Sequence, residues 1–208
     1  MIVVRNKLCS SDLRTRIQIT FLIFIILFFG VTVFAYYLLP EGLLKNKNPL
    51  QNWEASENIN ISAIQIFLYN SMSIMVIFLG SLFGRKKESE TQYLSLGYQA
   101  FFTLITINAI VLGTWSFSVE SESLPLITRL LRTFDLLHRA GLWEMSGQLL
   151  FTCSLAQSAI VLTNGKNTTT GKIKDIHLIR SERIAIVVGI LFLLVGALVE
   201  STAINNIA

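Results

Sequence analysis

The chain has 208 residues, of which 52% are hydrophobic and only 14% are charged. This balance excludes an ordinary soluble domain, in which about a quarter of the residues are charged. The formal net charge of +4 would suit a nucleic-acid partner, but the basic residues stand in short segments between long apolar runs. That arrangement is typical of a basic membrane protein. We therefore predict a single integral membrane domain over residues 1–208 that binds the lipid bilayer and no nucleic acid.

Five apolar runs are long enough to cross a bilayer, which takes about 20 helical residues. They cover about 17–39, 61–83, 94–117, 142–162 and 184–204. Residues 124–138 differ, because apolar side chains recur there at helical spacing while Arg129 and Arg132 fall on other faces. This pattern is typical of a helix that lies in the membrane interface or re-enters it. The predicted fold class is an all-α polytopic bundle of five transmembrane helices plus this interfacial or re-entrant helix.

The distribution of lysine and arginine predicts the orientation of the chain. With a cytoplasmic N-terminus, the inner segments hold four, three and five basic residues, twelve in all, and the outer segments hold the other five. Cytoplasmic loops of membrane proteins carry the excess of basic residues. We therefore expect a multi-pass protein of the cell (plasma) membrane with its N-terminus inside and its C-terminus outside.

The fourth predicted span carries an unusual number of polar residues. On a helix drawn at 100° per residue, its polar and small residues share an arc of about 160°; they are Glu144, Gly147, Gln148, Thr152, Ser154 and Ser158. A carboxylate facing hydrocarbon costs about 2.5 kcal/mol or more near the helix centre. The stripe should therefore face protein or water.

Depth along the predicted helices brings further polar groups towards Glu144. At 1.5 Å of rise per residue, Glu200 and Asn108 fall in the outer half of their spans and Asn70 near mid-depth. The predicted intramembrane polar cluster is Glu144, Glu200, Asn108, Asn70, Gln148, His138 and Arg139. It has two interpretations. Either the glutamates hold helices together, hydrogen-bonded or paired with Arg139 or Arg132, or they line an outward-facing polar cavity for a substrate or a partner segment.

Small residues mark the predicted packing faces of two helices. Gly189 and Gly196 share one side of the fifth span, and Gly80 and Gly84 close the second span as a GxxxG pair. Such positions let another backbone approach closely in a membrane. We expect packing between helices there, and the same faces are compatible with a homo-oligomer.

No motif for catalysis or metal binding is present in the sequence. An H-E-x-x-H pair is missing, and the two histidines, His138 and His177, fall on opposite sides of the predicted membrane. Cys9 lies in the basic tail and Cys153 in a span, so both are expected to be plain thiols. We predict no enzyme activity, no metal and no cofactor.

Several segments resemble the stage II sporulation protein M family of integral membrane proteins. The matching stretches are Ile66–Asn70 with Gly80 and Gly84, Asn108–Gly113, His138 with Gly141 and Glu144, and Ala197–Ala203. Together they cover about residues 65–204. The chain departs from the family pattern at Ser71, at Ala109, and in the three-residue spacing between His138 and Gly141.

The resemblance implies a non-catalytic membrane subunit that works with partners. Family members act with cell-wall hydrolases during engulfment, and relatives stand beside circular bacteriocin systems. It further suggests likeness to permease subunits of exporters, with an ABC-type ATPase docking at an inner loop. Here Ile176, His177 and Arg180 would form that dock, or the loop simply contacts lipid headgroups.

Two hypotheses follow. The first is a permease-like subunit of an export complex, driven by a separate cytoplasmic ATPase and handling a peptide or envelope-bound substrate. The second is a scaffold that recruits cell-wall-remodelling or other envelope proteins, or a bacteriocin maturation or immunity protein.

Overall fold

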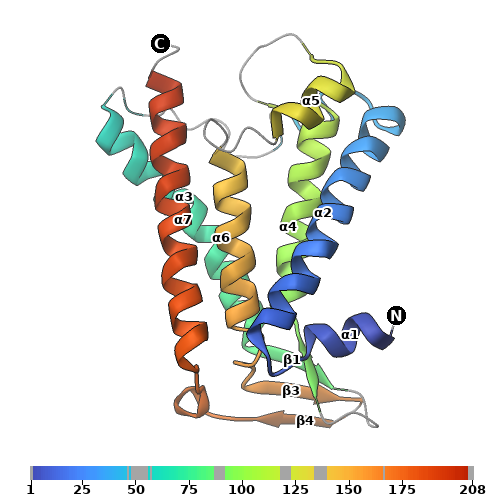
Figure 1. The fold of residues 1–208 in the computed structure, drawn as a ribbon, viewed down its shortest axis with the longest axis vertical. Helices are drawn as coiled ribbons and strands as arrows, with labels where there is room; N and C mark the ends of the chain where they lie inside the picture. Colours follow the sequence, from blue (N-terminus) through green and yellow to red (C-terminus); the bar gives the residue numbers. More distant parts are fainter. Residues whose placement is uncertain are drawn as a thin grey trace.

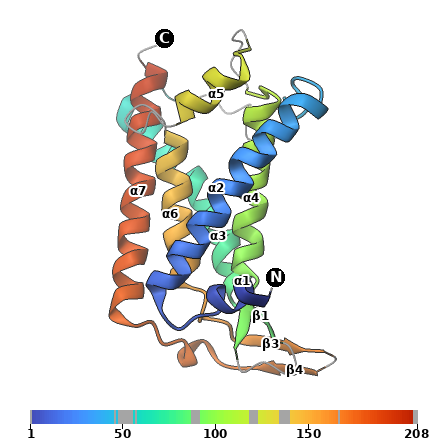
Figure 2. The ribbon, with the colours of Figure 1, turned by 45° about the vertical axis from the view of Figure 1, so that its right-hand side comes forward.

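Five large helices stand side by side in the computed structural model, above a small sheet at one end (Figures 1 and 2). The structure describes residues 2–45, 47, 56, 58–86, 92–117, 123–133, 140–165 and 167–205. A short helix, α1 (Ile2–Leu8), precedes the bundle, and α5 (Leu126–Thr133) lies obliquely across the end opposite to the sheet.

Within the described residues, three helices are long and apolar enough to cross a membrane. They are α2 (Leu13–Leu38), α3 (Ile59–Ser81) and α7 (Arg180–Asn205). The helices in the predicted third and fourth spans are shorter, α4 (Gly97–Gly113, 17 residues) and α6 (Ala140–Ser154, 15 residues). At 1.5 Å per residue they rise about 26 and 23 Å, less than the roughly 30 Å of a hydrocarbon core. Of the five predicted spans, three therefore have the expected length and composition.

Polar caps set where the first two long helices begin. The Asp12 carboxylate accepts hydrogen bonds from the Thr15 backbone N–H (2.9 Å) and hydroxyl (2.6 Å), so α2 begins at Leu13, before the expected start at residue 17. Asn58 accepts from the N–H groups of Asn60 and Ile61 at the start of α3. Such side chains satisfy the donors that the first turn of a helix leaves unpaired.

The all-α prediction is wrong at the N-terminal end of the bundle, where four short strands form one sheet. They are β1 (Phe83–Lys86), β2 (Tyr93–Ser95), β3 (Val161–Asn164) and β4 (Asn167–Thr170), in the order β2-β1-β3-β4. Strands β1 and β3 pair in parallel, with Phe83 opposite Val161, and the other pairs are antiparallel. The ends of the predicted second and fourth spans and the start of the third therefore belong to the sheet, because short apolar strands resemble continued helix in sequence.

The bundle packs around α6, which is surrounded by the other helices. Most side chains from Met145 to Ala156, which includes the two residues after the helix, are buried. Helix α6 contacts α2, α3, α4 and α7. Aromatic side chains from α2 and α4, among them Phe24, Phe28 and Phe101, complete the core. The two ends of the described chain lie at opposite ends of the bundle (Figure 1).

Candidate functional site

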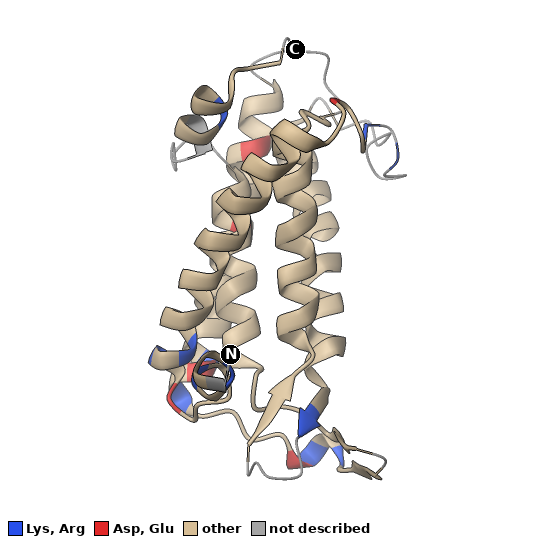
Figure 3. Cartoon of the chain, turned by 90° about the vertical axis from the view of Figure 1, so that its right-hand side faces the viewer, with Lys and Arg blue, Asp and Glu red and all other residues tan. Residues whose placement is uncertain are grey.

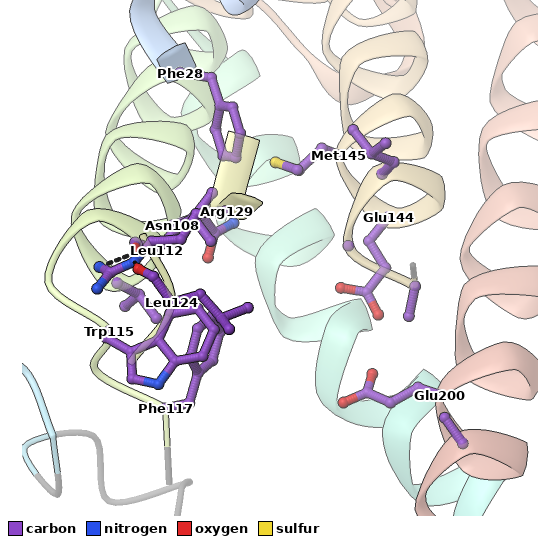
Figure 4. Close-up of a pocket in the computed structure, with 15 residues that line it drawn as sticks. Phe28, Asn108, Leu112, Trp115, Phe117, Leu124, Arg129, Glu144, Met145 and Glu200 are labelled. Carbon is purple, nitrogen blue, oxygen red and sulfur yellow. Dashed lines mark hydrogen bonds between the residues drawn. The ribbon is translucent and has the colours of Figure 1, made fainter. Parts of the chain in front are cut away.

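A cavity of about 490 Å³ lies between the helices, in the half of the bundle away from the sheet. Residues from α2, α4 and α5 form one side of it, and residues from α6 and α7 form the other (Figure 4). Its lining is mostly apolar, with a few polar groups: Asn108, Arg129, Glu144 and Glu200. A half-enclosed apolar cavity with few polar groups is the usual form of a ligand site.

Two carboxyl groups form one wall of the cavity. Glu144 comes from the first turns of α6 and Glu200 from α7, and their carboxyl groups point toward one another and interact (Figure 4). The Asn70 side-chain amide on α3 donates a hydrogen bond to the Glu144 carboxyl. Gly196 on α7 leaves room for the Glu144 side chain, because a Cβ built on Gly196 would lie only 3.1 Å from the Glu144 Cγ.

Arg129 stands on the opposite wall and is held there by main-chain oxygens. Its guanidinium donates to the carbonyl oxygens of Leu112 (3.2 Å) and Gly113 at the C-terminal end of α4, and to that of Leu124. The guanidinium carbon also lies 4.8 Å from the ring centres of both Tyr36 and Trp115. A cation at this position satisfies helix carbonyls that have no partner within the helix. Desolvation lowers the pKa of Arg129, while the nearby Glu41 acts in the opposite direction; an arginine nevertheless stays charged.

Comparison with family models, with curated proteins and with solved structures finds no match for this chain.

The structure brings together four residues of the predicted polar cluster. Asn70, Glu144 and Glu200 lie in contact, and Asn108 faces them from α4 on the other side of the cavity. Gln148 is buried one turn further along α6 than Glu144 and does not line the cavity. His138 and Arg139 lie outside the described residues, as does the side chain of Arg132. Within the described chain, the Glu144 carboxyl accepts a hydrogen bond from Asn70 and faces Glu200. The predicted pairings with Arg139 or Arg132 involve side chains outside the described residues and stay a prediction.

The polar stripe of α6 faces protein, as predicted. Gly147, Gln148, Thr152 and Ser154 are all buried, and Glu144 at the outer end of the stripe is half-buried and lines the cavity. Ser158 is buried too, but it lies beyond the end of the helix.

The predicted packing glycines serve contacts within this chain. Gly189 faces Gly147 so closely that a Cβ on Gly147 would lie 2.6 Å from the Gly189 carbonyl oxygen. Gly80 lies against the backbone of Leu96 and Gly97 at the start of α4. The assignment of Gly84 to a helix-packing face is wrong, because Gly84 lies in β1, where a Cβ would meet the Tyr93 ring at 2.6 Å.

Sequence reasoning missed two arginines that the fold buries. Arg129 was expected on a face of the interfacial helix other than its apolar one, and Arg16 was expected in the short basic tail before the first span. Arg16 instead forms a buried ion pair with Glu182 at the sheet end of the bundle. No local pattern distinguishes either residue from an exposed arginine, since their partners are far away in sequence. The predicted dock residues Ile176, His177 and Arg180 do lie at this sheet end, with His177 and Arg180 exposed.

Proposed function

We propose that the chain is embedded in the cell membrane with all five large helices crossing it. The three long apolar helices support insertion. The short helix α6 is surrounded by the others, so it does not have to match the thickness of the lipid. Most described lysines and arginines gather at the end that holds the N-terminus and the sheet (Figure 3), which supports a cytoplasmic position for that end and an outside position for the C-terminus.

Within that membrane, the chain acts as a non-catalytic, permease-like subunit of an export complex. The observation that carries this proposal is the cavity between the helices, with Glu144 and Glu200 on one wall and Arg129 on the other. Ionisable residues at membrane depth are costly and commonly mark a substrate path. The cavity lies toward the outer side, where a peptide or envelope-bound substrate would leave the protein.

A separate cytoplasmic ATPase would supply the energy at the sheet end. The half-buried Ile176 and the exposed His177 lie there in the connection that leads into α7, and the exposed Arg180 is the first residue of that helix. A partner that moves this connection would move α7, and with it Glu200. This gives a physical route from the dock to the cavity.

The test is gentle purification of the whole complex, followed by identification of the co-purifying proteins and a transport assay. We expect an ATPase to co-purify, and Glu144→Gln to stop transport while the complex still assembles. Replacing His177 and Arg180 by alanine should release the ATPase. Asp12→Asn, which changes an exposed carboxylate at the sheet end, is the matched control and should leave both results unchanged. Transport that continues in Glu144→Gln would contradict the proposal.

A scaffold function is the second candidate, and one surface favours it. The face of α3 that points away from the bundle carries Leu68, Met72 and Met75, each more than half exposed, next to other exposed apolar side chains. Flexible methionines suit adaptable contacts with a partner as well as with lipid. A cell-wall hydrolase in place of an ATPase in the purified complex would support this candidate. Glycine substitutions are no test of it, since these glycines pack the chain against itself.

A further inference from the structure

We infer that the cavity binds an organic cation with an apolar body, its ammonium or guanidinium group held between Glu144 and Glu200. The inference rests on the proposed function and names the class of substrate for the same cavity.

The wall formed by α6 and α7 holds two acidic side chains that face one another. They are the side chains of Glu144 and Glu200, and the hydrogen-bond partner that the described residues give to this pair is the neutral amide of Asn70. The one ion pair within the described chain, Arg16 with Glu182, is at the other end of the bundle. Two carboxylates brought together away from bulk water repel one another, and a cation between them removes this cost.

Arg129 does not supply that cation. It lines the same cavity, but Figure 4 places it on the wall opposite to the two glutamates. Three main-chain oxygens and two aromatic rings fix it in that position. Among the residues that the structure describes, no side-chain cation therefore reaches the carboxyl pair, and the region next to it can take a mobile cation.

The rest of the lining indicates an apolar body attached to the charge. Phe28, Leu112, Trp115, Phe117 and Met145 face the cavity. Aromatic rings and a thioether contact hydrocarbon well, and aromatic faces also attract cations. A volume of about 490 Å³ admits a ligand much larger than a metal ion or a lone ammonium group.

The same chemistry is available from two sources, a free amphipathic amine and the lysine side chain of an apolar peptide. Binding is measured by calorimetry and by tryptophan fluorescence, with the full chain in lipid nanodiscs. The first probe is 2-phenylethylamine, compared with uncharged 2-phenylethanol and anionic 3-phenylpropionate. The second is a short apolar peptide with one lysine, compared with the same peptide carrying glutamine instead.

We expect at least one cationic probe to bind saturably and at least tenfold more tightly than its neutral counterpart. Glu200→Gln should weaken this binding at least tenfold, because it removes one charge and keeps the size of the side chain. Asp12→Asn should bind like the natural chain. Melting curves of each variant show that the protein is folded. Binding of the peptide alone identifies a peptide substrate, and binding of the small amine alone identifies a free amine.

The inference is overturned if neither cationic probe binds, if neutral and cationic probes bind equally, or if Glu200→Gln binds as tightly as the natural chain. The proposed function is tested separately. If an ATPase co-purifies and export stops in Glu144→Gln, the proposed function stands even when no cation binds.

Discussion

At the sheet end of the bundle, Arg16 and Glu182 form an ion pair that is shut off from solvent. Arg16 is 0% exposed and Glu182 is 3% exposed. The second Glu182 oxygen accepts a hydrogen bond from the Ile179 backbone N–H at 3.0 Å, which fixes the carboxylate at the start of α7. The pair thus joins the first long helix to the last. A buried pair contributes little net stability, but removing one partner leaves a buried charge alone.

Arg16→Met and Glu182→Leu should each lower the free energy of unfolding by about 3–5 kcal/mol. The double variant should lose less than the sum of the two single losses, because it leaves no unpaired charge. Unfolding in mixed micelles with increasing SDS measures all three values. Strictly additive losses would show that the two side chains do not depend on one another.

The exposed Asp12 carboxylate gives α2 a pH-dependent cap. Hydrogen bonds from the Thr15 hydroxyl and backbone N–H lower the pKa of Asp12 below its ordinary value of 3.8. Since the folded state favours the ionised form, the stabilisation of the folded state by this cap is fully present above pH 3.8. It is lost as the pH falls through the lower pKa that Asp12 has in the folded state.

The melting temperature should therefore contain an acid-side decrease below about pH 4 that Asp12→Asn lacks. Asparagine is a good cap that does not titrate, so the variant should stay folded. Melting curves between pH 2 and pH 6 compare the two chains. Identical pH profiles would contradict the role given to Asp12.

The polar cluster shows how far single residues can be predicted. Asn70, Glu144 and Glu200 were expected to meet, because polar groups in apolar helices must find partners and depth follows from helical rise. Asn108 was expected with them, and it lines the same cavity from the other side. Arg129 and Arg16 were not found, because a basic residue close to a helix end has the same sequence pattern whether it is solvated or buried.

At the scale of elements, the most extensive contact between described helices is that of α6 with α7. Gly147 and Gly189 face one another, and each would bring a Cβ within 2.8 Å of the other's carbonyl oxygen. Gly30 on α2 has nothing within 4 Å of its would-be Cβ. Gly147 on α6 and Gly30 on α2 therefore offer a matched comparison of a crowded and an open glycine in the same bundle.

Gly147→Ala should destabilise the protein by about 1–3 kcal/mol, because a backbone carbonyl cannot move aside without separating the helices. Gly30→Ala should leave stability unchanged or raise it, since alanine favours helix by about 1 kcal/mol over glycine. Unfolding of both variants in the same detergent gives the comparison. Equal effects would mean that the close approach of α6 and α7 is not required.

The sheet is the element that the sequence hides best. Strands β1 and β3 are four residues long, and their parallel pairing joins segments almost 80 residues apart. Val161 and Leu162 continue the apolar run of α6, so their pattern gives no boundary. The Asn164-Gly165 pair is a hairpin signal, and Gly165 does have a positive φ of 58°. Even so, the strands on either side of the turn are too short and too polar to be predicted.

At the scale of the whole molecule, charge and topology point the same way. The described N-terminal segment, the sheet and most of the described lysines and arginines lie at one end of the bundle (Figures 1 and 3). The cavity lies toward the other end. In the proposed orientation the carboxyl pair faces the outer side while the basic end stays in the cytoplasm. Helix lengths do not determine it, since α4 and α6 are short for a membrane span.

Thiol labelling in intact cells tests this orientation most directly. The natural cysteines Cys9 and Cys153 are both buried and would be replaced by alanine. A single cysteine is then placed either at Ala203, which lines the cavity, or at Lys174, which is exposed at the sheet end. We predict that a membrane-impermeant maleimide labels Ala203→Cys from outside and labels Lys174→Cys only after the cells are permeabilised. Labelling of both positions from the same side of the membrane would contradict the account.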